Sequence, residues 1–158
     1  LHLRIIRSLL KSSVNEVVEA VRELQQEHQV NLRNIIVDED GVGGGVKDYL
    51  RCQGFVNNSK ALKGENYQNL KTQCYYKLAD IVNKGQVGIN CFDVNVKNQI
   101  IEECEQVRTK DADKDNKLQI ISKDTVKAII GRSPDYSDAL AMRMYFEIDG
   151  NFGKYFVH

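Results

Sequence analysis

The sequence lacks most of the features that mark specialised classes of protein. It has no tryptophan, one proline, three histidines and four cysteines in 158 residues, and its 22 basic residues equal its 22 acidic ones. The zero formal charge excludes a histone-like basic chain and an acidic solvating tail. With one proline and eleven glycines, the chain does not read as a disordered linker. No apolar run approaches the roughly 18 residues of a membrane span, and we expect no membrane association.

Cysteine and histidine give little support to a metal site or to nucleophilic catalysis. The cysteines contain no C-x-x-C pair and the histidines are far apart, so zinc ligation and a Ser/His/Asp triad are both disfavoured. Cys74 and Cys104 occupy apolar positions of helical patterns, which predicts buried thiols. Free thiols are typical of a reducing, cytoplasmic setting.

Strand-like and helix-like segments alternate along the chain, which is typical of an α/β domain. Ser13 and Glu16 form a capping box that predicts a helix through about His28. Ser133 and Pro134 supply the N-cap and N1 residues of a predicted last helix from Asp135 to about Phe146. The other predicted helices are 46–50, 67–82, 94–107 and 125–130, and the predicted strands are 1–10, 34–38, 55–56 and 117–121.

The predicted sheet is thin, with three or four strands for five or six helical segments. Because the chain also opens on Leu1 in what reads as a strand, we expect a fragment of a larger protein that lacks one or more N-terminal strands. Residues 1–148 are predicted to form one domain, and residues 149–158 a loose C-terminal tail.

A short apolar run ends in Asp38, which is the pattern of a central strand buried on both faces. The following residues, through Gly45, are too rich in glycine to predict regular structure. A dinucleotide loop would need a third glycine where Val46 stands, and a phosphate loop would need Gly-Lys-Ser/Thr. A metal-binding carboxylate at a strand end and a solvated acidic turn remain as interpretations.

Asp135 and Asp138 are three residues apart, so they share one face of the predicted last helix. Acids in a first turn commonly do no more than stabilise the helix dipole. The small and apolar residues after Asp138 favour a second interpretation, in which the helix packs closely on a sheet and directs this carboxylate toward a strand end.

Other polar clusters have ordinary interpretations. Residues 111–116 match the first half of a calcium loop, but the later glycine and bidentate glutamate are missing, so a polar loop is favoured. Tyr67, Tyr75 and Tyr76 are expected in the core or on a helix surface. The basic residues form two groups: the first, in and after the long loop, is Lys60, Lys63, Lys71 and Lys77, and the second, before the last helix, is Lys123, Lys127 and Arg132. Both groups are expected on the solvated surface, although the second could hold a phosphate backbone.

Three stretches within residues 35–141, taken in order, resemble the C-terminal nuclease domain of the large subunit of tailed-phage terminases, the DNA-packaging motor. Residues 35–46 are similar to the family's apolar strand, Asp-x-x-Gly-Val-Gly and short helix. Residues 65–71 resemble its helix entry, and residues 123–141 its last helix with the preceding segment. The ordered set is more specific than any one stretch.

The resemblance implies an RNase H-like mixed sheet flanked by helices, and an endonuclease that cuts concatemeric double-stranded viral DNA by two-metal hydrolysis. It implies that Asp38 and Asp138 bind Mg²⁺ or Mn²⁺ and that Asp135 assists them. It also implies that the full protein has an ATPase domain and meets a portal and a small terminase subunit in the bacterial cytoplasm. The residues expected to contact DNA are Lys123, Lys127, Arg132, Gly43 and Gly44.

The sequence departs from the family in two places. The family's first catalytic Asp lies in an Asp-x-Ala/Gly opening on the first strand, and no such stretch precedes Leu1. We therefore expect weak metal binding and weak or absent cutting. No Walker A motif is present, so this chain alone should not hydrolyse ATP. Two alternatives remain: a non-catalytic α/β module that docks on the packaging machinery, and another RNase H-like enzyme such as a junction resolvase.

Overall fold

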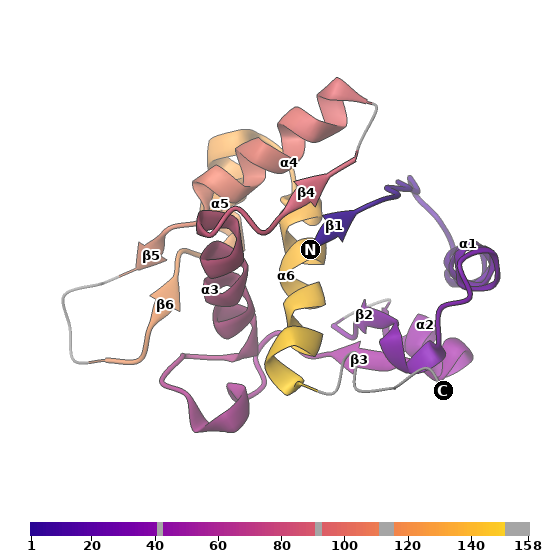
Figure 1. Cartoon of the computed structure of the whole chain (residues 1–158), viewed down its shortest axis with the longest axis horizontal. Coiled ribbons are helices and arrows are strands. Elements are labelled where there is room, and N and C mark those ends of the chain that lie inside the picture. The colour runs from indigo at the N-terminus through magenta and orange to yellow at the C-terminus, as the bar shows by residue number, and fades with distance from the viewer. Residues whose placement is uncertain (41–42, 91–92, 111–115, 151–158) are drawn as a thin grey trace.

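The computed structural model describes residues 1–40, 43–90, 93–110 and 116–150. These residues form a mixed α/β structure in which helices dominate (Figure 1). The helices are α1 (Val14–Glu27), α2 (Gly43–Leu50), α3 (Leu70–Asn83), α4 (Val94–Gln106), α5 (Lys123–Ile130) and α6 (Asp135–Asp149). The strands are β1 (His2–Leu3), β2 (Ile36–Asp38), β3 (Gln53–Phe55), β4 (Gly88–Ile89), β5 (Thr109–Lys110) and β6 (Gln119–Ile120).

The described strands pair in three separate two-stranded sheets, so they do not form the single mixed sheet that we expected. β1 is parallel to β4, β2 is parallel to β3, and β5 and β6 form an antiparallel pair. The strand predicted over residues 1–10 is wrong beyond Leu3, where the pairing with β4 ends. Ile5, Leu9 and Leu10 follow it as exposed residues outside any strand.

β2 is also not the fully buried central strand that its apolar residues predicted. Its three residues are half-buried, and β3 is its one partner among the described strands. The register places Asp38 opposite Phe55, so the residues that follow both strands emerge at the same sheet edge. Regular structure begins earlier in the glycine-rich segment than expected, because α2 starts at Gly43 and the predicted helix started at Val46.

Two predicted helix starts had different outcomes. The capping box at α1 is confirmed: Glu16 N–H donates to Ser13 Oγ, and Ser13 N–H donates to the Glu16 carboxylate. The predicted start of α6 at Asp135 is confirmed, but its N-cap is one residue later than the predicted Ser133. Pro134 is its N-cap and offers no side-chain hydrogen bond, and Asp135 is its first residue. The helix ends at Asp149, three residues beyond the predicted end.

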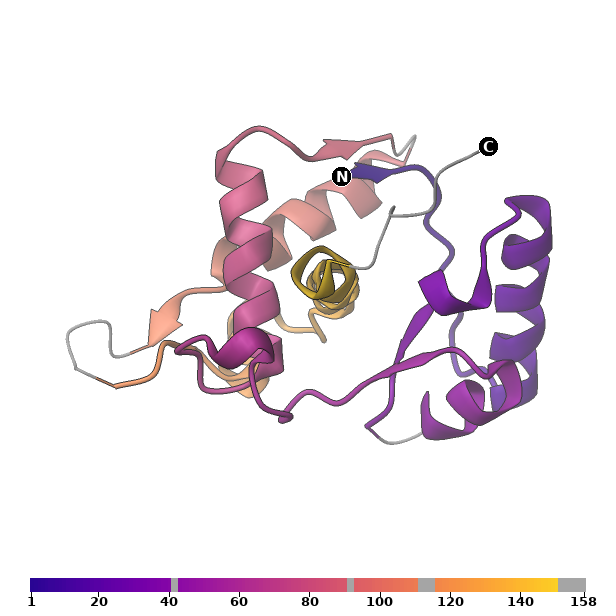
Figure 2. The same cartoon turned by 60° about the horizontal axis from the view of Figure 1, so that its bottom comes forward.

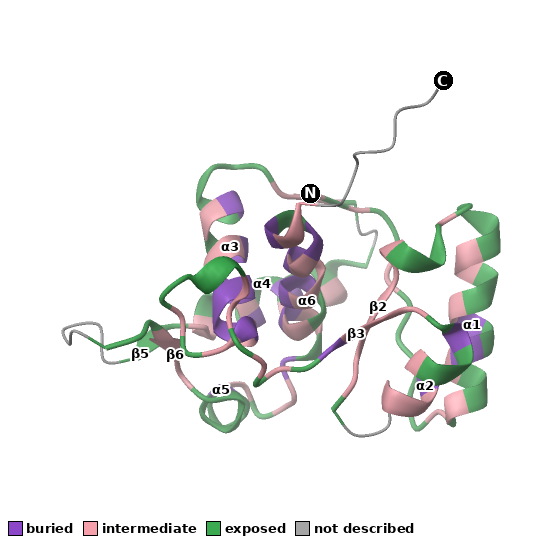
Figure 3. Ribbon diagram, turned by 90° about the horizontal axis from the view of Figure 1, so that it is seen from below, coloured by how far each residue is buried: buried purple, intermediate pink, exposed green. Residues whose placement is uncertain are grey.

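The main hydrophobic core lies among α3, α4 and α6, which pack together in Figure 2. It contains Cys74, Tyr75 and Met144, and Phe55 reaches it from β3. A second, smaller cluster joins α1 to α2 through Val18, Val46 and Leu50. In Figure 3 the buried positions are concentrated on α3 and α6, while α1 and α2 lie to one side. The site residues therefore lie on elements with two different packing environments.

The thiols follow the sequence prediction closely. Cys74 is buried, Cys104 is half-buried, and both are free. Burial raises the pKa of Cys74 to about 12 and that of Cys104 to about 11, so both stay protonated and unreactive at neutral pH. No helix in the described ranges is long and apolar enough to span a bilayer. The acidic loop 111–115 and the tail 151–158 lie outside the described residues, as do Gly41, Val42 and Cys91.

Candidate active site

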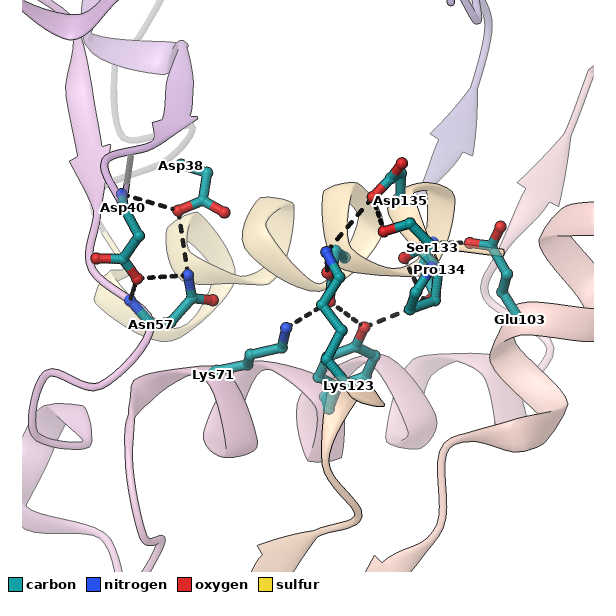
Figure 4. A network of polar contacts seen from close by, with 12 residues as sticks. Asp38, Asp40, Asn57, Lys71, Glu103, Lys123, Ser133, Pro134 and Asp135 are labelled. Atoms are coloured by element: carbon teal, nitrogen blue, oxygen red, sulfur yellow. Dashed lines mark hydrogen bonds and ion pairs between the residues drawn. The ribbon is translucent and has the colours of Figure 1, made fainter. Parts of the chain in front are cut away.

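Asp138 lies in the first turn of α6 with only 14% of its side chain exposed. Each of its carboxylate oxygens has its own ammonium partner. Lys71 of α3 lies 2.7 Å from Oδ1, and Lys123 of α5 lies 2.8 Å from Oδ2. The hydroxyl of Tyr75 also donates to Oδ1, at 2.6 Å. Three groups from two other helices therefore fix this carboxylate, and Figure 4 labels the two lysines among them.

The charge of Asp138 is stabilised by these contacts. Burial by itself would raise the pKa of this carboxyl, but the hydrogen bonds from Lys123, Lys71 and Tyr75 outweigh it, so its pKa lies below the ordinary value. Burial and the Asp138 charge both raise the pKa of Tyr75, which stays a hydrogen-bond donor. The sequence predicted Asp138 but treated Lys71 as solvated surface, and that prediction is wrong: the Lys71 side chain is 20% exposed.

A buried glutamate of α4 holds the start of α6. Pro134 cannot cap the helix with its side chain, and Glu103 accepts a hydrogen bond from Ser137 N–H at 2.8 Å instead. Glu103 is fully buried and pairs with Arg132, which also pairs with Glu102. Ser137 Oγ in turn lies 3.1 Å from the hydroxyl of Tyr75. The backbone next to Asp138 and the side chain of Asp138 are thus positioned by one connected network.

Asp135 lies beside Asp138, as the helical spacing predicted, but at the rim of the network. Its side chain is 76% exposed. It accepts a hydrogen bond from Ser133 Oγ at 2.6 Å and lies 3.4 Å from Lys123 Nζ. Lys123 therefore bridges both acids, because the same ammonium contacts Asp138 at 2.8 Å.

Asp38 ends β2 and belongs to a second polar cluster. Its Oδ1 accepts hydrogen bonds from Asp40 N–H and from the side-chain amide of Asn57, each at 3.1 Å. The same amide donates to Asp40 Oδ2 at 2.7 Å. Asn57 lies two residues after the end of β3, so the parallel pairing of β2 and β3 brings it to the two acids. Sequence reasoning missed Asn57, although its position just after a predicted strand was a usable signal.

The glycines after Asp38 have a packing role that can be checked. A Cβ atom at Gly43 would overlap the carbonyl oxygen of Asp38, so only glycine lets α2 begin against the end of β2. Gly44 is less restricted, since a Cβ there would lie 3.6 Å from the Glu39 carbonyl oxygen, an ordinary contact. The predicted role of both glycines in admitting DNA stays a prediction.

A cavity of about 450 Å³ is bordered by direct partners of both predicted metal-binding acids. Asp40 and Asn57, which bind Asp38, line one part of it, and Lys71 and Lys123, which bind Asp138, line another. Figure 4 shows the Asp38 cluster to one side of the two lysines, with Glu103 on the other. The fold thus brings partners of both acids to one cavity, although neither acid lines it.

The other predicted DNA-contacting residues are placed differently from Lys123. Lys127 is exposed on α5 and does not line the cavity. Arg132 is turned toward α4, where Glu102 and Glu103 neutralise its charge. Among the predicted basic residues, the cavity therefore favours Lys123, and it adds Lys71 and Lys110.

The donors near the cavity suit a divalent cation in kind but do not form a complete site. Carboxylate and amide oxygens are the ligands that Mg²⁺ and Mn²⁺ prefer. Within the described ranges, however, no three acids, histidines or cysteines are close enough together to hold a metal ion. Asp38 and Asp138 share no hydrogen-bond partner there, and both oxygens of Asp138 face ammonium groups.

Comparison with solved structures shows that the chain shares the α/β fold of a nuclease domain. The chain matches the nuclease domain of the large terminase subunit gp2 of bacterial virus Sf6 with a TM-score of 0.68 and 22% sequence identity, over 85% of this chain and 74% of that one. A mutant of that domain with manganese and beta-thujaplicinol matches with a TM-score of 0.70 and 22% identity, over 89% and 76%.

A structure of the same mutant with calcium, described as gp2c of the large terminase subunit of bacteriophage Sf6, matches with a TM-score of 0.65 and 21% identity, over 85% of this chain and 74% of that one. No family model and no curated protein sequence matches the chain. The resemblance to a terminase nuclease domain is therefore confirmed at the level of fold, over most of the chain.

Proposed function

We propose that this chain is a metal-dependent nuclease domain of a phage or prophage DNA-packaging motor, with an RNase H-like fold and double-stranded DNA as its substrate. The observation that carries the proposal is the cavity of about 450 Å³, lined by partners of both Asp38 and Asp138. Two-metal hydrolysis of a phosphodiester needs acids from separate elements that converge on one place, and Asp38 at the end of β2 and Asp138 in the first turn of α6 both lie behind residues of this cavity. The fold shared with the Sf6 domain supports the same conclusion.

The proposed ligands of the divalent cation are Asp38 and Asp138, and we propose Mg²⁺ or Mn²⁺ as that cation. The mutant Sf6 domains with manganese and calcium support a divalent ion. Since the described residues contain no group of three metal-binding side chains, a further acid from outside them would complete the site. We therefore propose that this chain alone binds the metal weakly.

The chain's own residues have roles that do not depend on the ion. Glu103 fixes the first turn of α6, and Tyr75 fixes the direction of the Asp138 carboxylate. Lys123 holds Asp135 and Asp138 together at the cavity. In the full protein we propose an ATPase domain, a portal and a small subunit as partners, in the cytoplasm of the bacterial host.

The proposal is tested by incubating the protein with supercoiled plasmid and Mn²⁺, and by titrating Mn²⁺ into the same protein by electron paramagnetic resonance. We expect slow, Mn²⁺-dependent nicking that Asp38→Asn and Asp138→Asn each abolish, together with a loss of Mn²⁺ affinity. Asp124→Asn, at an exposed acid of α5, is the matched control and should behave as wild type. Full nicking by both site variants would contradict the assignment.

A second candidate is a non-catalytic interaction module of the packaging machinery. One observation favours it, because two lysines already neutralise Asp138 and the carboxylate is stable as an ion-pair acceptor without a metal. An unchanged melting temperature and no bound Mn²⁺ at saturating concentrations would support this module over the nuclease.

A further inference from the structure

We propose that Lys71 and Lys110 contact the sugar–phosphate backbone of duplex DNA in the 450 Å³ cavity, together with Lys123. The choice of DNA as ligand rests on the proposed function. The assignment of these two lysines goes beyond it, because it rests on the composition and geometry of the cavity walls. The two residues lie far apart in the sequence, Lys71 on α3 and Lys110 on β5, and only the fold brings them to one cavity.

The walls of the cavity are rich in donors that bind phosphate oxygens. Three lysines line it, and Asp40 is the single carboxylate among its described lining residues. Most of the remaining lining side chains are carboxamides and hydroxyls, including Asn58 and Ser122. Lysines, amides and hydroxyls supply most protein contacts to a nucleic-acid backbone, so the cavity has the chemistry of a backbone site.

Lys71 is held in place for such a contact. Its ammonium lies 2.7 Å from Asp138 Oδ1 and 5.8 Å from the centre of the Tyr75 ring. An ammonium has three N–H donors, and the ion pair uses one of them. Asp138 does not itself line this cavity, whereas Lys71 does. The carboxylate therefore anchors the lysine from behind and leaves donors facing the cavity, which lowers the entropy cost of binding a phosphate.

Lys110 reaches the same cavity from the β5–β6 hairpin. It is exposed and ends β5, directly opposite Gln119 of β6 in the antiparallel register. Gln119 also lines the cavity. The hairpin and the start of α3 thus form two walls, and a backbone that passes between them would contact a lysine on each.

The cavity favours a duplex over a single strand. Proteins that bind single strands without sequence preference stack the bases on aromatic side chains. The described residues that line this cavity include no Phe, Tyr or Trp, and Ile120 and Ile121 are their only apolar members. Contacts to a backbone whose bases stay paired are therefore the binding mode that these walls can supply.

Fluorescence anisotropy with a short labelled duplex in EDTA separates this inference from catalysis. Measured from about 50 to 200 mM salt, Lys71→Gln and Lys110→Gln should each lower the salt slope of log K by about 0.9 and loosen binding about five-fold. Lys77→Gln is the matched control, since Lys77 lies on the same helix outside this cavity and faces Asp80. It should bind as wild type.

The outcomes are distinct for the two proposals. Unchanged DNA affinity and an unchanged salt slope in Lys71→Gln and Lys110→Gln would overturn this inference. An equal loss of affinity in Lys77→Gln would also overturn it, as would tighter binding of a labelled single strand than of the duplex. Should Lys71→Gln unfold, Lys110→Gln decides, because Lys110 forms no ion pair with any residue that the structure describes. Duplex binding that depends on both lysines, without Mn²⁺-dependent nicking, would support this inference and would favour the non-catalytic module over the nuclease.

Discussion

At Asp138, two ammonium groups and a phenol hydroxyl meet one carboxylate that is 14% exposed. Coulomb attraction is stronger in such a place than in water, and each partner also satisfies a hydrogen bond. The arrangement makes Asp138 the residue on which the conformations of Lys71 and Lys123 depend. It also explains why an acid in a first helical turn has a role here beyond the helix dipole.

Replacing Asp138 by asparagine should therefore destabilise the fold in a pH-dependent way. Near neutral pH we expect a loss of about 2 kcal/mol in the free energy of unfolding, because two lysines lose their charged acceptor. The Asp138 pKa is lowered below its ordinary value of 3.8 in the folded state, so its contribution is fully present above that pH. It is lost as the pH falls through the folded pKa.

Urea unfolding at a series of pH values would measure this difference between wild type and Asp138→Asn. The gap between the two proteins should narrow below pH 3.8. Asp135→Asn, at a carboxyl whose side chain is 76% exposed, should show little change at any pH. A constant gap across the series would show that the ion pairs do not stabilise the fold.

Among the elements, α6 depends on α4 for its start. Helices usually cap their first turn with a local Ser, Thr, Asp or Asn. Here the N-cap is proline, and Glu103 supplies the missing acceptor across a helix–helix interface. Burial is the largest influence on the pKa of Glu103 and raises it, while Ser137 N–H and Arg132 oppose that shift. The charge of Glu103 is therefore tolerated only because both partners are present.

Glu103→Ala should cost about 3 kcal/mol of stability, since it leaves Ser137 N–H and one face of Arg132 without an acceptor in the core. Glu102→Ala is the matched control, because Glu102 binds the same arginine and its side chain is 51% exposed. It should cost much less. Chemical denaturation followed by circular dichroism measures both stabilities. Equal losses would show that Glu103 stabilises the fold through Arg132 and not by capping α6.

In the whole molecule, two hydrophobic clusters are joined through the β2–β3 pair. The large cluster holds α3, α4 and α6, and the small one holds α1 and α2. Phe55 extends from β3 into the large cluster and is 1% exposed. Since Asp38 and Asn57 flank that pair, the packing of Phe55 also fixes the Asp38 side of the cavity.

Truncation of Phe55 to alanine should cost about 3–5 kcal/mol and increase hydrogen exchange in β2, β3 and α6 together. Val18→Ala, in the small cluster, should cost less and increase exchange in α1 and α2 alone. Hydrogen exchange measured by mass spectrometry distinguishes the two patterns. Increased exchange restricted to β3 in Phe55→Ala would show that the two clusters are not coupled through this side chain.

The sequence by itself determined the helices and the polar residues at their ends. The capping box of Ser13 and Glu16, and the apolar spacing of α3 and α4, depend on neighbours within a few residues, so local chemistry suffices. The same holds for Asp38 at a strand end and for the shared face of Asp135 and Asp138. The glycines after Asp38 indicated that the backbone comes close to another group, but not that α2 would begin against the end of β2.

Tertiary structure alone decided which charges meet. Lys71 and Asp138 are far apart in sequence, as are Glu103 and Ser137, and each pair forms only because α3, α4 and α6 pack around one core. From sequence alone, a lysine on a helix is expected at the solvated surface. Only the packing of a second helix over it shields its side chain from water. Strand length was likewise decided by pairing, because the ladder of β1 ends where β4 ends, and the apolar residues that follow Leu3 could not extend it.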